Sequence, residues 1–161
     1  MICIVEIATV FNFFLIIFVN NLLSCLMSKI MNIALVDDDK DESDFFQIAL
    51  DFLGIDFQFQ FYNTAKDFVT HIEKPESKLP DIVFVDMSMP EISGKDLIEL
   101  LRKNVRFDGI QAVIYTAHIS EKDKQAMMEL GTFEFFIKPT EFSALTQMLK
   151  EMIDRRKAKH N

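Results

Sequence analysis

Polar residues that could take part in chemistry stand at the ends of four apolar, strand-like runs. These are Asp37, Asp38 and Asp39 after residues 33–36, Asp86 after residues 82–85, Thr116 after residues 113–115, and Lys138 after residues 133–137. A carboxylate at the end of a buried strand, followed by an irregular loop, is a candidate phosphate acceptor or metal ligand. Asp86 fits this description because Pro90 and Gly94 break regular structure after it. Both chemistries remain open until the other residues are placed.

The apolar pattern around these residues indicates alternating strands and helices. We expect strands at residues 33–36, 57–61, 82–85, 110–115 and 133–137, and helices around residues 45–53, 65–72, 97–101, 120–131 and 142–153. Gly54 and Gly131 mark helix ends, while Thr64 (or Asn63) and Ser120 mark helix starts. Strands alternating with helices of this length predict a parallel sheet covered on both faces. In such sheets the ligand site lies beyond the carboxyl ends of the strands.

Composition narrows the class of protein. A chain of 161 residues is most simply one domain, and its net charge of -8 argues against a nucleic-acid-binding surface. The basic run at residues 155–159 is typical of a solvated helix end. Cys3 and Cys25, the only cysteines, lie outside the strand–helix region, so no disulfide framework holds the fold and a reducing compartment suits it.

Residues 2–27 differ from the rest of the chain because they carry a single charge, Glu6. Their length and polarity are close to those of a membrane-spanning helix, and they lack the basic start of a secretory signal. Three interpretations remain: a membrane anchor with Lys29 on the cytoplasmic side, a true translation start at Met27 or Met31, or a packed soluble helix. We therefore divide the chain into a hydrophobic extension (1–30), a domain (31–156) and a basic tail (157–161).

Four segments together resemble the motifs of a response regulator receiver domain. They are Val36-Asp37-Asp38-Asp39, Val85-Asp86-Met87-Ser88-Met89-Pro90 with Gly94, Tyr115-Thr116-Ala117, and Ile137-Lys138-Pro139. The resemblance covers residues 31–156. It implies a flavodoxin-like, doubly wound α/β fold with a five-stranded parallel sheet of order 2-1-3-4-5 and helices on both faces. It also implies a phosphoacceptor of a two-component or phosphorelay system rather than an enzyme that turns over a substrate.

The resemblance assigns Asp86 as the phosphoacceptor and places a metal ion beside it. Neighbouring strands lie about 4.8 Å apart, so carboxylates at their ends can share one cation, and crowded carboxylates repel one another without it. The ligands would be Asp37, Asp38, Asp86 and the backbone carbonyl of Ser88. The ion would be Mg²⁺, with Mn²⁺ as a substitute.

The remaining motif residues would bind phosphate or transmit its presence. By resemblance, Thr116 and Lys138 hold the phosphoryl group, Ala117 leaves space for it to enter, and Ser88 and His118 modulate autodephosphorylation. Thr116 and Phe135 would couple phosphorylation to a docking surface, although Phe135 lacks the hydroxyl of the Tyr frequent there. Pro139 would follow a cis peptide bond that aims Lys138 inward.

Competing interpretations of the acidic residues differ in strength. An EF-hand beginning at Asp37 requires Gly and Glu where this chain has Glu42 and Ile48, so it is excluded. A haloacid-dehalogenase-like phosphatase remains an alternative, although Asp41 departs from its motif. A scaffold that is never phosphorylated also remains, since residues 37–39 alone could simply be an acidic helix start.

The expected partners follow from the resemblance. A sensor histidine kinase or a histidine phosphotransfer protein would donate the phosphoryl group. Only a short basic tail follows the last predicted helix, so we expect a stand-alone domain whose downstream protein target docks on the last two helices and the fifth strand. We expect no direct contact with nucleic acid. The domain would be cytoplasmic, and tethered to the inner face of the membrane only if residues 2–27 are an anchor.

Overall fold

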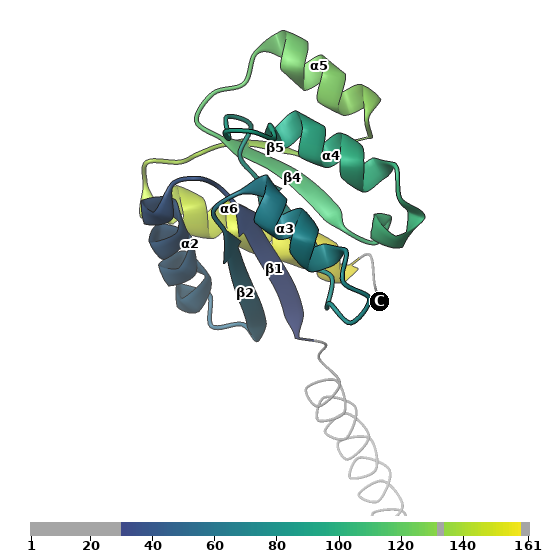
Figure 1. The fold of residues 1–161 in the computed structure, drawn as a ribbon. Helices are drawn as coiled ribbons and strands as arrows, with labels where there is room; N and C mark the ends of the chain where they lie inside the picture. The colour runs from purple at the N-terminus through teal and green to yellow at the C-terminus, as the bar shows by residue number, and fades with distance from the viewer. Residues whose placement is uncertain (1–29, 132–133, 159–161) are drawn as a thin grey trace, which may run out of the picture. The chain divides into compact units, whose positions relative to one another are not determined.

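The structure is a computed structural model that describes residues 30–131 and 134–158 (Figure 1). The hydrophobic segment at residues 2–27, for which three interpretations were open, lies outside these described ranges. Within them, no helix combines the length and apolar character needed to cross a membrane.

Strands and helices alternate along the described residues. The strands are β1 (Met31–Val36), β2 (Phe57–Tyr62), β3 (Ile82–Val85), β4 (Gln111–Thr116) and β5 (Phe135–Ile137). The helices are α2 (Lys40–Phe52), α3 (Ala65–Ile72), α4 (Gly94–Arg102), α5 (Glu121–Glu129) and α6 (Phe142–Ala158), with a short 3-10 helix η1 (Val105–Phe107) between α4 and β4.

The five strands form one parallel sheet in the order β2-β1-β3-β4-β5, as predicted. β1 pairs with both β2 and β3, so the strand order reverses beside β1 (Figure 1). All four residues of β3 are buried, which agrees with its continuous apolar sequence and its central place. The point of reversal lies between the carboxyl ends of β1 and β3, where a ligand site is expected in such sheets.

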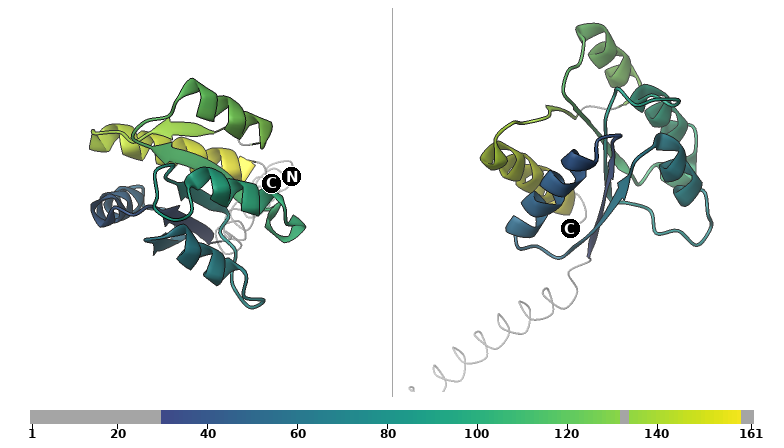
Figure 2. Two further views of the ribbon diagram at one scale, coloured as in Figure 1. Left: turned by 45° about the horizontal axis from the view of Figure 1, so that its top comes forward. Right: turned by 60° about the vertical axis from the view of Figure 1, so that its left-hand side comes forward.

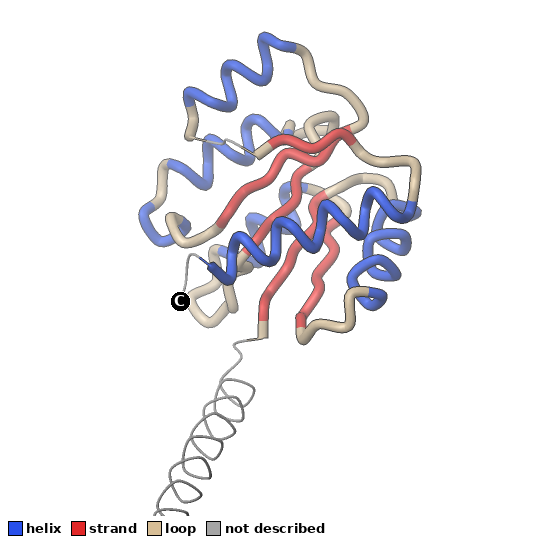
Figure 3. Tube along the Cα trace, turned by 180° about the vertical axis from the view of Figure 1, so that it is seen from behind, coloured by secondary structure: helices blue, strands red, loops and turns tan. Residues whose placement is uncertain are grey.

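Helices cover both faces of the sheet. In Figure 2 (right), α2 and α6 lie on one side of the strands, and α3 and α4 lie on the other. Figure 3 views the molecule from behind, and there α6, the helix that leads to the C-terminus, lies across the strands on the viewer's side. Each side has its own buried apolar cluster. The cluster under α2 and α6 includes Phe46, Phe84 and Tyr115, and the cluster under α3, α4 and α5 includes Phe68 and Met127.

Helix starts follow a repeated local pattern of a hydroxyl residue with Asp three positions later. Ser93 accepts a hydrogen bond from the backbone N–H of Asp96, and Ser120 accepts one from Asp123. The same pairing at the start of α3 confirms Thr64, rather than Asn63, as its cap. Such caps satisfy N–H groups that the first helical turn leaves without partners.

Two elements differ from the prediction. η1 was not predicted, because a single turn shows no apolar periodicity; Asn104 begins it by accepting a hydrogen bond from the N–H of Arg106. α6 continues to Ala158, so the predicted boundary at residue 156 falls inside the helix. Its last turn holds Arg155, Arg156 and Lys157, whose charge complements the negative end of the helix dipole.

Candidate functional site

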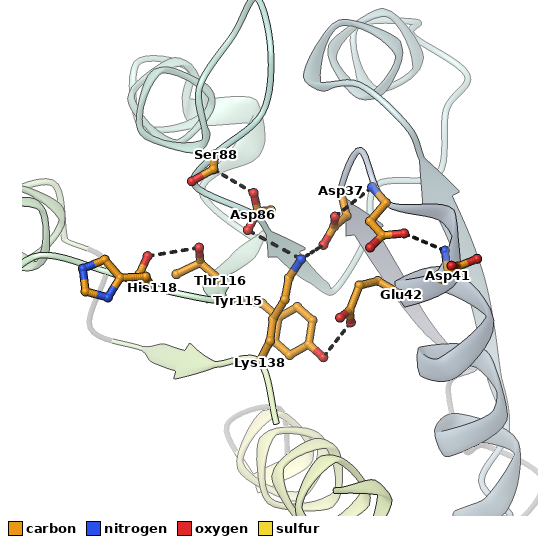
Figure 4. A network of polar contacts seen from close by, with 10 residues as sticks. Asp37, Asp41, Glu42, Asp86, Ser88, Tyr115, Thr116, His118 and Lys138 are labelled. Carbon is orange, nitrogen blue, oxygen red and sulfur yellow. Dashed lines mark hydrogen bonds and ion pairs between the residues drawn. The ribbon is translucent and has the colours of Figure 1, made fainter. Parts of the chain in front are cut away.

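Hydrogen bonds continue the sheet just beyond the strand ends and draw the polar residues together. The N–H of Asp86 donates to the carbonyl of Val36 at 2.9 Å, and the N–H of Lys138 donates to the carbonyl of Thr116 at 2.9 Å. Asp37, Asp86, Thr116 and Lys138 therefore lie at one edge (Figure 4). This is the edge where the sequence places a ligand site.

The ammonium group of Lys138 lies between two buried carboxylates. Its Nζ is 2.7 Å from Asp37 Oδ2 and 3.7 Å from Asp86 Oδ1. Burial lowers the pKa of Lys138, but the hydrogen bond that Lys138 donates to Asp37 and the charges of Asp37 and Asp86 outweigh burial, and the pKa lies above its ordinary value. Lys138 is thus a cation held beside both carboxylates.

Asp37 is fully buried, and its environment disfavours its charge. Burial raises the pKa of Asp37, and the nearby charge of Asp86 raises it further. Two contacts lower it: the ammonium group of Lys138, and the N–H of Asp39, which donates to Asp37 Oδ1 at 3.1 Å. The net shift of the pKa is upward. With Asp37 and Asp86 ionised, two buried carboxylates share a single ammonium group. The site therefore carries excess negative charge.

The loop after Asp86 holds the carboxylate in one orientation. The backbone N–H of Ser88 donates to Asp86 Oδ2 at 2.7 Å, which leaves Oδ1 facing Lys138. Asp86 retains only 5% of its surface exposed, so access to it is narrow.

Gly94 allows α4 to begin directly against the backbone of Asp86. A Cβ at Gly94 would lie 2.2 Å from the carbonyl oxygen of Asp86 and 2.9 Å from the Cα of Met87. The sequence suggested only that Gly94 breaks regular structure; in fact it is the first residue of a helix and is required by close approach.

Thr116 and Phe135 lie on the same side of the sheet. Phe135 pairs with Ile114 and packs on the cluster under α3, α4 and α5, and Thr116 shares the side of Ile114 because strand residues alternate. The Thr116 hydroxyl is buried and donates to the carbonyl of His118 at 3.2 Å. The side chains of Ala117 and His118 are exposed.

Asp38, the third predicted carboxylate, is exposed. Across residues 30–131 and 134–158, no three His, Cys, Asp or Glu side chains converge closely enough to hold a metal ion. The site nevertheless suits a hard cation chemically, because Asp37 and Asp86 are oxygen donors whose combined charge exceeds that of Lys138.

The bond before Pro139 differs from the expectation. No peptide bond in the described residues is cis, so the prediction of a cis bond between Lys138 and Pro139 was wrong. Lys138 still points toward Asp37 and Asp86 (Figure 4).

The sequence analysis assigned no role to two residues that lie beside the site, Tyr115 and Glu42. The Tyr115 hydroxyl donates to Glu42 Oε2 at 3.1 Å, and the Lys138 ammonium lies 5.8 Å from the centre of the Tyr115 ring. A signal existed, since a tyrosine in an otherwise apolar buried strand needs a partner for its hydroxyl. The identity of that partner, 73 residues away, was not readable.

Comparison with known proteins agrees with the fold and the motifs. The model of the response regulator receiver domain matches residues 33–150. The hybrid signal transduction histidine kinase D of Dictyostelium discoideum is 30% identical over 102 residues, which are 63% of this chain and 7% of the kinase. The response regulator ArlR of Staphylococcus saprophyticus is 24% identical over 134 residues, which are 83% of this chain and 56% of ArlR. Each match spans only part of the relative.

A solved structure shares the fold. The crystal structure of the Mn(2+)-bound form of response regulator Rcp1 superposes with a TM-score of 0.68 at 22% identity, covering 76% of this chain and 91% of the Rcp1 chain.

The chain belongs to the response regulator receiver domain family. The predicted family and flavodoxin-like fold are therefore confirmed, and residues 33–150 form a receiver domain of the kind found in two-component response regulators. The family consists generally of signalling domains without an enzymatic function of their own.

Proposed function

We propose that Asp86 is the residue that accepts the phosphoryl group, and that its phosphorylation is read by a partner protein. The observation that carries this proposal is the placement of Lys138, whose ammonium group lies between Asp37 and Asp86 at 2.7 and 3.7 Å. A fixed cation beside a buried carboxylate is the arrangement that phosphoryl transfer needs, because charge on the phosphoryl oxygens must be neutralised.

The transfer step uses the carboxylate as a nucleophile. One oxygen of Asp86 forms a bond to the donor phosphorus, and the bond from phosphorus to the donor breaks with its electron pair on the leaving group. For a kinase or phosphotransfer protein, that leaving group is the imidazole of a phosphohistidine. Ser88 N–H holds Asp86 Oδ2, so Oδ1 is the oxygen available for attack.

Other residues of the chain hold the transferred group. Lys138 would form an ion pair with a phosphoryl oxygen, and Thr116 would exchange its bond to the His118 carbonyl for a bond to another oxygen. Ala117 has a small, exposed side chain that would leave space for the phosphoryl group to enter, and the exposed Ser88 and His118 would affect hydrolysis of the phosphoaspartate.

Asp37, Asp38, Asp86 and the Ser88 carbonyl are the groups that we propose for a divalent cation. When bound, Mg²⁺ (or Mn²⁺) supplies neutralisation of the carboxylates and the phosphoryl oxygens. The relative Rcp1, solved in its Mn(2+)-bound form, supports the choice of a divalent ion.

Thr116 and Phe135 are the residues that we propose for the response to phosphorylation. Because they share one side of β4 and β5, movement of the Thr116 hydroxyl toward phosphate can be passed to the Phe135 ring. The downstream protein would dock on α5, β5 and α6. The proposal places the domain in the cytoplasm, where a sensor histidine kinase or a histidine phosphotransfer protein would donate the phosphoryl group.

Labelling with a small phosphodonor tests the assignment of Asp86. Wild-type protein incubated with acetyl phosphate and Mg²⁺ should gain the mass of one phosphoryl group, and a chelator should abolish the gain. Asp86→Asn should not be labelled, whereas Asp108→Asn, a control that removes an exposed aspartate, should be labelled normally. Undiminished labelling of Asp86→Asn would remove Asp86 as the acceptor. Release of phosphate from many unrelated phosphoesters would favour a phosphatase, and no labelling of wild type would favour a scaffold.

A further inference from the structure

We propose that Tyr115, held by Glu42, is a positioning residue that fixes Lys138 for its role at Asp86. The inference rests on the proposed function, because it concerns the same lysine and the same phosphoryl group. It adds a contact between helix α2 and the site, made by Tyr115 and Glu42, to which the motif resemblance assigns no role.

Tyr115 is rigidly held. It lies one residue before Thr116 in β4, is fully buried, and faces the side covered by α2 and α6. Its ring makes edge-to-face contacts with Phe46 (centroids 5.5 Å apart) and Phe84 (6.2 Å). Contacts of this geometry fix the plane of an aromatic ring. The last two residues of β4 therefore face the site from opposite sides of the sheet, Thr116 with a hydroxyl and Tyr115 with a ring.

Glu42 anchors the far end of the ring. It lies in the first turn of α2 and accepts the hydrogen bond of the Tyr115 hydroxyl at 3.1 Å (Figure 4). Burial and the neighbouring charge of Glu42 raise the pKa of Tyr115 far above its ordinary value, so the hydroxyl remains a donor. A buried hydroxyl without this acceptor would be left unsatisfied, so the bond selects one position of the ring.

The anchored ring limits where Lys138 can go. The ammonium group of Lys138 lies 5.8 Å from the centre of the Tyr115 ring, and it also contacts Asp37 and Asp86. Attraction between a cation and an aromatic face is strongest where water is excluded, and Lys138 is 14% exposed. The Lys138 ammonium is already 1.0 Å closer to Asp37 than to Asp86 (2.7 against 3.7 Å). Without the ring, this flexible side chain would be free to turn away from Asp86.

The test compares labelling rates at saturating acetyl phosphate. Glu42→Ala removes the acceptor and Tyr115→Phe removes the donor, so each should lower the maximal rate about threefold. The double variant should be no slower than either single variant, since both lose one hydrogen bond. Glu42→Gln, which keeps an acceptor, should restore the rate. The half-saturating concentration of acetyl phosphate should not change. Tyr115→Leu, which removes the ring, should label about tenfold more slowly.

The controls separate a positioning role from stability and from net charge. Asp44→Asn removes an exposed carboxylate from the same helix and should label like wild type. The inference fails if Glu42→Ala and Tyr115→Phe melt at lower temperature but label at the wild-type rate, because the bond would then be structural only. It also fails if the double variant is slowed by the product of the single effects. Loss of labelling in wild type would instead overturn the proposed function itself.

Discussion

The two sides of the sheet are packed in different ways. Under α2 and α6, Phe46 stacks on Phe59 and meets Phe84 and Tyr115 edge to face. Under α3, α4 and α5 the buried cluster is mainly aliphatic, and α5 contributes one buried residue, Met127, where α6 contributes six.

This difference matches the two tasks that we propose for the site. Lys138 must be held, and it lies over Tyr115 on the aromatic side. Thr116 and Phe135 would have to respond to phosphate, and they lie on the side where α5 has few buried residues. Segments with few buried apolar contacts open at low free-energy cost. We therefore expect the aromatic side to anchor the lysine and the α5 side to move.

Truncating the two cores tests this contrast most strongly. Phe46→Ala should lower the free energy of unfolding by about 4 kcal/mol, because a fully buried ring with three aromatic neighbours is lost. Met127→Ala should cost only about 2 kcal/mol, since α5 can adjust around the gap. Urea unfolding of both variants measures the two losses in the free energy of unfolding. Phe52→Ala, on the exposed face of α2, should change stability by only about 0.5 kcal/mol. Equal costs for Phe46 and Met127 would contradict the contrast.

The next largest effect is expected on the α4 side, at the loop after Asp86. Gly94→Ala places a Cβ against the Asp86 carbonyl, so α4 or the loop must shift, at a cost of about 3 kcal/mol. Labelling of Asp86 by acetyl phosphate should fall as well. Gly109→Ala is the matched control, because a Cβ there meets nothing within 4 Å, and it should change stability by about 0.5 kcal/mol or less. If Gly94→Ala had the stability and labelling of wild type, the loop after Asp86 would move aside at little cost in free energy, which would contradict this prediction.

The smallest expected effect is the change in stability on replacing Asp37, which lies at the carboxyl ends of the strands, where the two sides of the sheet meet. The pKa of Asp37 is raised in the folded protein by burial, so its contribution to stability is present below the unfolded pKa, near 3.8, and is lost as pH rises through the folded value. At neutral pH the ionised carboxylate therefore destabilises the fold. In a chelator, Asp37→Asn should be more stable than wild type at pH 7, by on the order of 1 kcal/mol.

The pH dependence of that difference is its check. The advantage of Asp37→Asn, measured by urea unfolding, should shrink toward zero as pH falls to about 3, below the unfolded pKa of aspartate. Added Mg²⁺ should stabilise wild type more than the variant if Asp37 helps to hold the ion. An advantage that does not vary with pH would show that the charge of Asp37 is not its cause.

Local patterns predicted most of the fold. The strands and helices follow from apolar periodicity, and Thr64, Ser120, Gly54 and Gly131 act locally on the neighbouring backbone, so their positions were readable. The single turn η1 was missed because it is too short for periodicity. Gly94 was found but misread, since its close approach to Asp86 depends on where α4 lies.

The sequence also predicted where the candidate site lies, but not which contacts its residues make. Strand ends of a parallel sheet meet at one edge, so Asp37, Asp86, Thr116 and Lys138 could be placed together from strand order alone. Which carboxylate would contact the lysine could not be read. The structure buries Asp37 against Lys138 and leaves Asp38 exposed, because that choice depends on how the chain turns after β1 and on where the lysine of a distant strand lies.

By itself, then, the sequence determined the order of the elements and the edge of the sheet at which Asp86, the proposed phosphoacceptor, lies. These depend on residue types and spacings within a few positions of one another. Tertiary structure alone decided the contact between Tyr115 and Glu42 and the different packing of the two sides of the sheet. Those features join residues tens of positions apart, and only the packing of helices on the sheet brings such residues within reach.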